Sequence, residues 1–177
     1  MYFVTNCVIS GKKMNTTDNV VFFPYFDSHP GDPDFVYCES AALRSEFEKW
    51  HLRDRIIKKV RDFWIQWSHE KRPISILIEN QNFLIVKSEI EKKISLFCLN
   101  HVFSVDFTID AWKRFVDLML TSEKSHINTI ENDSLFWNVN TTNDNVMLQA
   151  IGIRRDSIVM PLTDWLNLQE LLSTIRS

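Results

Sequence analysis

The sequence predicts an α+β protein: N-terminal hairpins lead into one long helix, and two antiparallel strand-rich units follow, each closed by a C-terminal helix. The helix is predicted because apolar residues recur at three- and four-residue steps over residues 39–71, with no Gly or Pro before Pro73. The strand-rich units are predicted because β-branched and aromatic runs alternate with turns beyond Pro73. A chain of 177 residues with 45% hydrophobic residues is long enough to bury a sizeable core.

The N-terminal forty residues read as short strands. Apolar runs at residues 2–4, 20–26 and 35–37 have strand length and are separated by polar segments. Residues 28–34 contain two prolines, one glycine and two aspartates, which is the chemistry of turns. We therefore expect hairpins with a loop at residues 28–34.

The long helix is expected to begin after Ser40 as its N-cap and to end just before Pro73. Trp50, Trp64 and Trp67 fall on one stripe of this helix, and three indole rings expose more apolar surface than one helix can leave in water. The stripe is therefore predicted to be buried between the two halves of the protein, with the helix as a structural spine.

Two similar units are predicted in the second half, and they are expected to pack as one compact domain. Residues 73–121 contain four strand-like runs and a helix that Thr108 caps, and residues 134–177 contain three strand-like runs and a final helix. The polar residues 121–133 form the predicted linker. When Trp112 is aligned with Trp165, the apolar residues Val105, Ile109, Phe115, Leu118 and Met119 align with Ile158, Leu162, Leu168, Leu171 and Leu172. Residues 1–72 make up the remaining region.

The charge is unevenly distributed. The whole chain carries a net charge of −3, but residues 39–72 hold nine basic and six acidic side chains. This excess fits either a helix face that meets phosphate or an acidic partner, or a solvated face laced with ion pairs. The solvated, ion-paired face is the favoured interpretation.

The sequence predicts a cytoplasmic protein. It contains no run of about eighteen apolar residues that would span a membrane, and no signal peptide is evident. Three cysteines without a secretory context favour reduced thiols in the cytoplasm.

The first fifty residues resemble a degenerate treble-clef zinc knuckle. The sequence CVISGKK from Cys7 matches a Cys-x-x-Cys-Gly-Lys knuckle whose second cysteine is Ser10. The sequence FVYCESAAL matches the second half of such a finger, in which Ala41 replaces the cysteine that follows Cys38. The resemblance implies that Cys7 and Cys38 are remnants of a zinc site. Structural zinc needs four thiolate or imidazole ligands, and His29 and His51 lie outside knuckle spacing, so no metal or other cofactor is expected.

The two strand-rich units are similar to the repeat of transcription-coactivator-type proteins that bind single-stranded DNA, in which a strand meander ends in a helix near a tryptophan. This similarity implies a topology and an alternative function in single-stranded nucleic-acid binding. The basic residues available for that function are Arg53, Lys58 and Lys59. Such proteins have a strongly basic sheet face, whereas residues 73–177 hold nine basic and thirteen acidic side chains.

No catalytic motif is found. The five histidines are scattered without metal-ligand spacing, and neither a Gly-x-Ser-x-Gly nor another nucleophile signature occurs, so the protein is not expected to be an enzyme. A mildly acidic chain with polar loops and aromatic residues resembles bacterial toxin-immunity proteins in general character. That resemblance implies a cytoplasmic protein, with no membrane association, that binds and blocks a cognate toxin domain.

Overall fold

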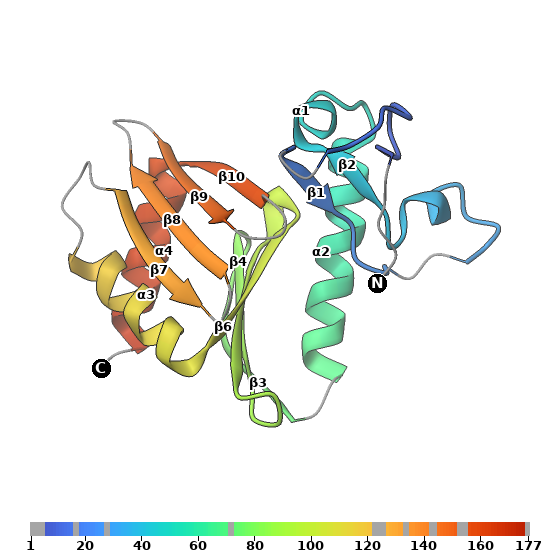
Figure 1. Ribbon diagram of the computed structural model, residues 1–177. Coiled ribbons are helices and arrows are strands. Elements are labelled where there is room, and N and C mark those ends of the chain that lie inside the picture. Colours follow the sequence, from blue (N-terminus) through green and yellow to red (C-terminus); the bar gives the residue numbers. More distant parts are fainter. Residues whose placement is uncertain are drawn as a thin grey trace.

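The protein has the mixed α+β architecture that the sequence predicts, and its described residues form antiparallel sheets and four α-helices (Figure 1). The computed structural model describes residues 6–15, 18–26, 29–70, 73–121, 127–132, 135–141, 145–151 and 156–175. The predicted strand at residues 2–4 and the predicted helix end at residues 71–72 lie outside the described residues.

A small two-stranded sheet forms the N-terminal part. Strand β1 (Val20–Phe22) pairs antiparallel with β2 (Ala41–Leu43). The predicted strand at residues 35–37 is instead a 3-10 helix, η1 (Phe35–Tyr37). The amides of Phe35, Tyr37 and Cys38 each donate to a carbonyl three residues earlier, so this segment satisfies its backbone locally and needs no partner strand.

The single long helix predicted over residues 39–71 is wrong at its N-terminal end. The long helix is α2 (Arg53–Glu70), and a four-residue helix, α1 (Arg44–Phe47), precedes it. Ser40 is not an N-cap, because its hydroxyl donates to the carbonyl of Tyr37 at 2.6 Å. The residues after Ser40 pair with β1 and place two alanines in the core, which stabilises a strand where helical periodicity favoured a helix.

The first strand-rich unit is a meander followed by a helix. Its sheet has the order β3-β4-β5-β6, and a 3-10 helix, η2 (Leu99–His101), joins the last two strands. The strands are β3 (Ile74–Glu79), β4 (Phe83–Ser88), β5 (Lys93–Cys98) and β6 (Phe103–Thr108), and the helix is α3 (Ile109–Thr121). The predicted cap is confirmed, because the Thr108 Oγ1 accepts a hydrogen bond from the Ala111 amide at 3.2 Å.

The second unit repeats this order in a separate sheet, β10-β9-β8-β7. Its elements are β7 (Ile127–Asn132), β8 (Leu135–Thr141), β9 (Asn145–Ile151), β10 (Asp156–Pro161) and the helix α4 (Leu162–Ile175). The linker predicted at residues 121–133 is therefore wrong over β7. Its sequence, INTIEN, lacks an apolar run, and as an edge strand it pairs only with β8, a position that tolerates polar residues.

The repeat predicted from the two tryptophans is confirmed. Every strand and helix of the first unit begins 52 or 53 residues before its counterpart in the second. Trp112 and Trp165 are 7% and 3% exposed, and the aligned pairs Phe115 with Leu168 and Met119 with Leu172 are buried in one shared core. A single pattern of sheet and helix thus builds both units.

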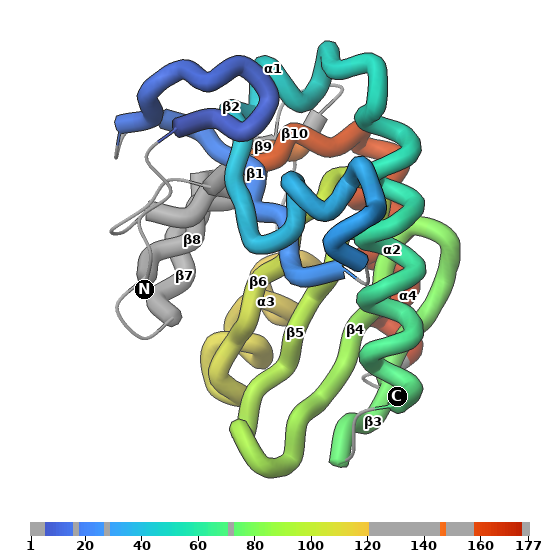
Figure 2. The backbone as a smooth tube through the Cα atoms, turned by 90° about the vertical axis from the view of Figure 1, so that its right-hand side faces the viewer, coloured from blue at the N-terminus to red at the C-terminus, as the bar shows by residue number. Residues whose placement is uncertain are grey.

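Two hydrophobic cores lie on opposite faces of the first sheet. Helix α2 covers one face, and α3 covers the other while also contacting β7 and α4 (Figures 1 and 2). Strand β4 shows the consequence, because Phe83 and Ile85 belong to the α3 core and Leu84 and Val86 to the α2 core. On the α2 side Trp64 is 5% exposed, whereas Trp50 and Trp67 are only partly buried.

Candidate functional site

The η2 corner places a histidine where the N-terminal part meets the second unit. The hairpin loop before β4 holds this corner, since the Asn82 side-chain oxygen accepts from the Asn100 amide group and the Asn82 carbonyl accepts from the Leu99 amide, both at 2.8 Å. Val102, which follows the corner, has a left-handed backbone with φ 47° and is 2% exposed. A β-branched residue rarely adopts this conformation, so the surrounding packing must fix it.

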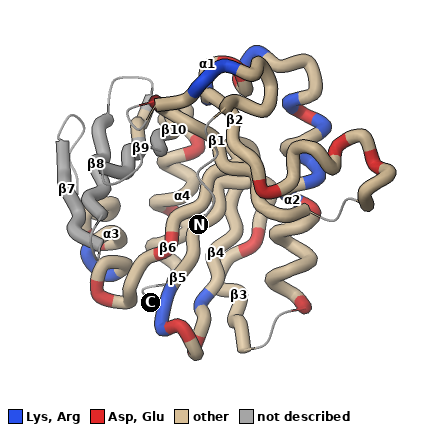
Figure 3. Tube along the Cα trace, turned by 45° about the vertical axis from the view of Figure 1, so that its right-hand side comes forward, with Lys and Arg blue, Asp and Glu red and all other residues tan. Residues whose placement is uncertain are grey.

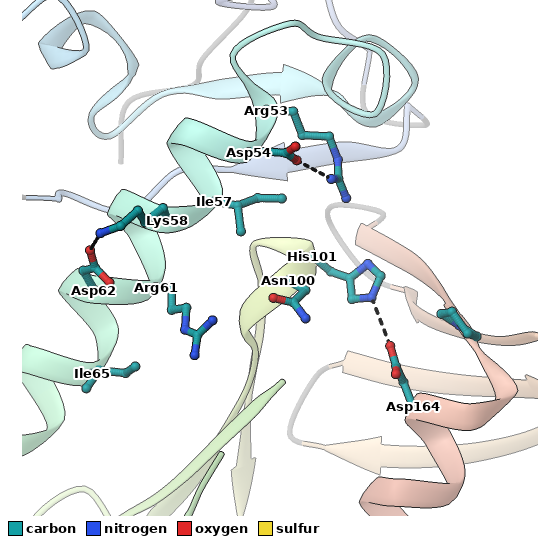
Figure 4. A pocket seen from close by; sticks show the side chains of 11 residues that line it. Arg53, Asp54, Ile57, Lys58, Arg61, Asp62, Ile65, Asn100, His101 and Asp164 are labelled. Carbon is teal, nitrogen blue, oxygen red and sulfur yellow. Dashed lines mark hydrogen bonds and ion pairs between the residues drawn. The ribbon is translucent and has the colours of Figure 1, made fainter. Parts of the chain in front are cut away.

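His101 lines two open cavities. The first, called here the α2 groove, has a volume of about 770 Å³ (Figure 4). It is lined by Arg53, Asp54, Ile57, Lys58, Arg61, Asp62, Ile65, Asn100, His101, Pro161 and Asp164. The second cavity, of about 750 Å³, lies on the other side of His101 between α1 and β10, where Lys12, Lys13 and Arg44 contribute to its wall. The histidine thus forms part of both walls.

Burial lowers the pKa of His101, and the nearby guanidinium of Arg44 lowers it further. Glu48 and Asp164 act in the opposite direction, and Arg53 adds a small lowering effect. The Asp164 carboxylate is 4.0 Å from the His101 Nε2, too far for a strong hydrogen bond. The ring is therefore held neutral in the folded protein, while the His101 carbonyl accepts from the Arg44 Nη1 at 3.1 Å.

We expect His101 to lower the free energy of unfolding of the protein at mildly acidic pH. Because its pKa is lower in the folded chain than its ordinary value of 6.5, the unfolded chain binds more protons as the pH falls through that value. The resulting stability is present above this pH and lost below it. In urea unfolding at pH 7.5 and pH 5.5, the wild type should lose more free energy of unfolding on acidification than the His101→Asn variant. Equal losses would show that the ring titrates alike in both states.

Helix α2 lays two stripes of side chains along the groove. One stripe consists of Arg53, Ile57, Arg61 and Ile65, and the other of Asp54, Lys58 and Asp62, at steps of four residues. Most of the charges neutralise one another: the Lys58 ammonium lies 2.5 Å from Asp62, and the Arg53 guanidinium lies 3.0 Å from Asp54 and 3.1 Å from Glu48. Arg61, in contrast, makes no ion pair or hydrogen bond within the described part of the chain, and it points into the groove (Figure 4).

The structure brings together two of the three basic residues named from the sequence. Arg53 and Lys58 both line the α2 groove, whereas Lys59 lies on another face of α2, where it contacts Asp32 and Asp34 at 2.7 Å. All three are ion-paired, which agrees with the solvated, salt-bridged interpretation of the helix. Sequence reasoning missed His101 and Asp164 because they come from different units, and no spacing in the chain marks their proximity.

Loop 29–38 is fixed on α2 by a buried carboxylate. Asp34 is 1% exposed, and its Oδ2 lies 2.8 Å from the Arg55 Nη2 and 2.7 Å from the Lys59 Nζ. The loop presents Phe35 and Val36 to solvent with 39% and 60% exposure, and Tyr25 on the adjoining segment is 50% exposed. Acidic residues mark this loop, while Lys and Arg gather around α1 and the start of α2 (Figure 3).

The turn at Cys7 folds back on β2. The Cys7 amide donates to the Lys12 carbonyl and the Gly11 amide to the Cys7 carbonyl, both at 2.8 Å, and the left-handed φ of 71° at Gly11 suits a glycine. Burial acts to raise the pKa of the Cys7 thiol, but hydrogen bonds from the Ser10 hydroxyl and from the Leu43 amide outweigh it and lower this pKa. The Cys38 thiol instead donates to the Phe26 carbonyl at 3.1 Å.

No protein-family model matches the chain, and no curated protein matches it. Among solved structures, the chain is similar to a protein of unknown function from the DUF155 family of Prochlorococcus sp. NATL2A. The identity is 11%, the match covers 56% of this chain and 97% of the other, and the TM-score is 0.38. Similarity at this level transfers neither a fold nor a function.

The described residues show neither a metal-binding cluster nor a helix suited to cross a membrane. Within these residues no group of three or more His, Cys, Asp and Glu side chains is arranged to hold a metal ion. None of the helices in the same part of the chain is long and apolar enough to cross a membrane.

Proposed function

We propose that the protein is a toxin-neutralising protein of the immunity type, which binds and blocks a cognate bacterial toxin domain. One observation carries this proposal: loop 29–38 presents exposed apolar side chains, Phe35 and Val36, while ion pairs of Arg55 and Lys59 to the buried Asp34 carboxylate hold the loop in place. Exposed aromatic residues on a rigid segment lose little entropy on binding, and they are enriched among the residues that dominate binding energy.

The overall charge of the chain favours a basic partner. In the loop, Asp32 and Asp34 are paired with Arg55 and Lys59, and Glu39 at its edge adds an exposed carboxylate. Residues 73–177 are also acidic overall. Nuclease toxins are commonly basic, so this distribution would speed association with such a domain. The three cysteines are free thiols, which supports a cytoplasmic site of action.

The test is co-expression with a toxin-like domain encoded directly upstream of this chain. We expect the wild type to restore growth, and the double variant Phe35→Ser, Val36→Ser to lose protection with an affinity loss of about 100-fold, as for two binding hot spots. The matched control is Ile90→Ser, because Ile90 is also a large exposed apolar residue, at 74%, but lies in the β4–β5 turn. The absence of such a reading frame, or protection that survives the double substitution, would contradict the proposal.

Single-stranded nucleic-acid binding is the second candidate, and one observation favours it: the chain contains two units of four antiparallel strands followed by a helix. The ion-paired state of Arg53, Lys58 and Lys59 makes these residues weaker phosphate ligands. In addition, α2 covers one face of the first sheet. A gel shift with a single-stranded oligonucleotide at low ionic strength tests this function, and a complex that dissociates with added salt would support it.

We further propose that the N-terminal region descends from a treble-clef finger that has lost its metal. The support is the tight turn at Cys7, in which Ser10 occupies the position of the missing cysteine and its hydroxyl acts to lower the pKa of the remaining thiol. The Leu43 amide also contacts the Cys7 sulfur at 3.4 Å, which joins the two halves of the former finger. Purified protein should contain well under one zinc ion per chain by elemental analysis. A stoichiometric zinc content would overturn this origin.

A further inference from the structure

We infer that the α2 groove is a docking site for a segment of a partner protein that carries one carboxylate between apolar side chains. This site is separate from the surface invoked above, because Arg55 and Lys59 hold loop 29–38 whereas Ile57 and Arg61 line the groove. The inference therefore does not depend on the proposed immunity function.

The guanidinium of Arg61 has no ion pair or hydrogen bond among the described residues. Arg61 is partly buried, while the neighbouring Arg53 and Lys58 have carboxylate partners. A guanidinium presents a planar set of N–H donors that matches a carboxylate in a bidentate arrangement. Of the three cations that line the groove, Arg61 is thus the one with binding capacity to spare.

The charge balance of the groove favours a carboxylate over a phosphate. Its walls carry three cations and three anions, and the carboxylates of Asp54, Asp62 and Asp164 surround the site. A phosphate with two negative charges would meet strong repulsion from these groups, whereas a single carboxylate replaces only the missing partner of Arg61. The lowered pKa of His101 keeps that ring neutral, so it adds no positive charge at pH 7.

The isoleucines on either side of Arg61 indicate which residues should flank the carboxylate in the docked segment. Ile57 and Ile65 stand four residues before and after Arg61, which places them about 6 Å along the helix on either side of it. Both are only partly buried in the core that α2 covers. A segment with apolar residues on both sides of an acidic one therefore matches the stripe in charge and in spacing.

The experiment is a selection of random dodecapeptides displayed on phage against the full chain, with the Arg61→Gln variant used to subtract other binders. We expect the recovered peptides to carry Asp or Glu flanked by apolar residues. Their affinity, measured by fluorescence anisotropy, should fall at least about tenfold in Arg61→Gln, the effect of losing one charge-assisted contact. Changing the acidic residue of the peptide to its amide should cause a similar loss.

Two control variants sharpen the result. Lys49→Gln removes an exposed cation that does not line the groove, so affinity should change less than threefold. Arg61→Lys keeps the positive charge but lacks the planar set of N–H donors, so it should retain part of the peptide binding. Recovery of basic or uncharged peptides, recovery of none, binding that ignores Arg61, or stronger competition by inorganic phosphate than by acetate would each overturn the inference.

Discussion

Trp64→Ala should lower the free energy of unfolding by about 3–5 kcal/mol, the range of large aromatic truncations in a core. Trp64 is 5% exposed, and its ring lies 5.0 Å from that of Phe97 on β5, so it joins α2 to the first sheet. The partly buried Trp67 also contacts Phe97, with ring centroids 6.2 Å apart. It cannot fill the space that the Trp64→Ala substitution leaves, because protein cores are closely packed. Denaturant melts monitored by circular dichroism measure the loss.

The matched control for this truncation is Gln66→Ala on the same helix. Gln66 is exposed, and its side chain contacts Glu70 at 2.7 Å, so its removal should change stability by less than about 0.5 kcal/mol. A loss well under about 1 kcal/mol for Trp64→Ala would mean that α2 separates readily from the sheet. The tryptophan surface would then be accessible to a partner.

Much of the second half of the fold could be predicted because its signals are local. The strands of the first unit have continuous β-rich runs, the Thr108 cap is visible in the sequence, and the Trp112–Trp165 alignment identified the repeat of the two units. Strand β7 escaped prediction since an edge strand with one partner needs no apolar run. The α+β class followed from the helical periodicity before Pro73 and from the β-rich runs between turns after it.

The N-terminal half shows where periodicity fails. Residues 41–43 carry a helical pattern, yet they form β2 because β1, about twenty residues earlier, supplies its hydrogen-bond partners. Likewise, the site residues Arg61, His101 and Asp164 come from three elements that only the tertiary fold brings together. Such contacts leave no trace in residue spacing, and a single sequence therefore showed the basic helix but not its groove.

Asp34→Asn should cost about 2–3 kcal/mol of stability and release loop 29–38. The substitution preserves shape but removes a buried negative charge that pairs with two cations. Breaking a fully buried ion pair costs about 3–5 kcal/mol, and the effect is smaller here because the side chains of Arg55 and Lys59 are 49% and 28% exposed and can regain water. Hydrogen exchange of the amides at residues 35–38 should accelerate together with this loss.

Asp32→Asn separates the loss of charge from the loss of the buried anchor. Asp32 shares Lys59 with Asp34, but it is more exposed, and its Oδ1 accepts the Asp34 amide, a bond that asparagine can keep. Asp32→Asn should therefore lower the free energy of unfolding by less than Asp34→Asn, and the size of this loss should depend on pH. The hydrogen bond from the Lys59 ammonium lowers the pKa of Asp32, so the stability that this carboxylate contributes is present above its ordinary pKa of 3.8 and disappears as the pH falls below it.

If both variants lose equal stability, or if the exchange of the loop amides is unchanged in Asp34→Asn, the buried carboxylate does not hold the loop. Phe35 and Val36 would then lack the fixed presentation on which their role in partner binding depends.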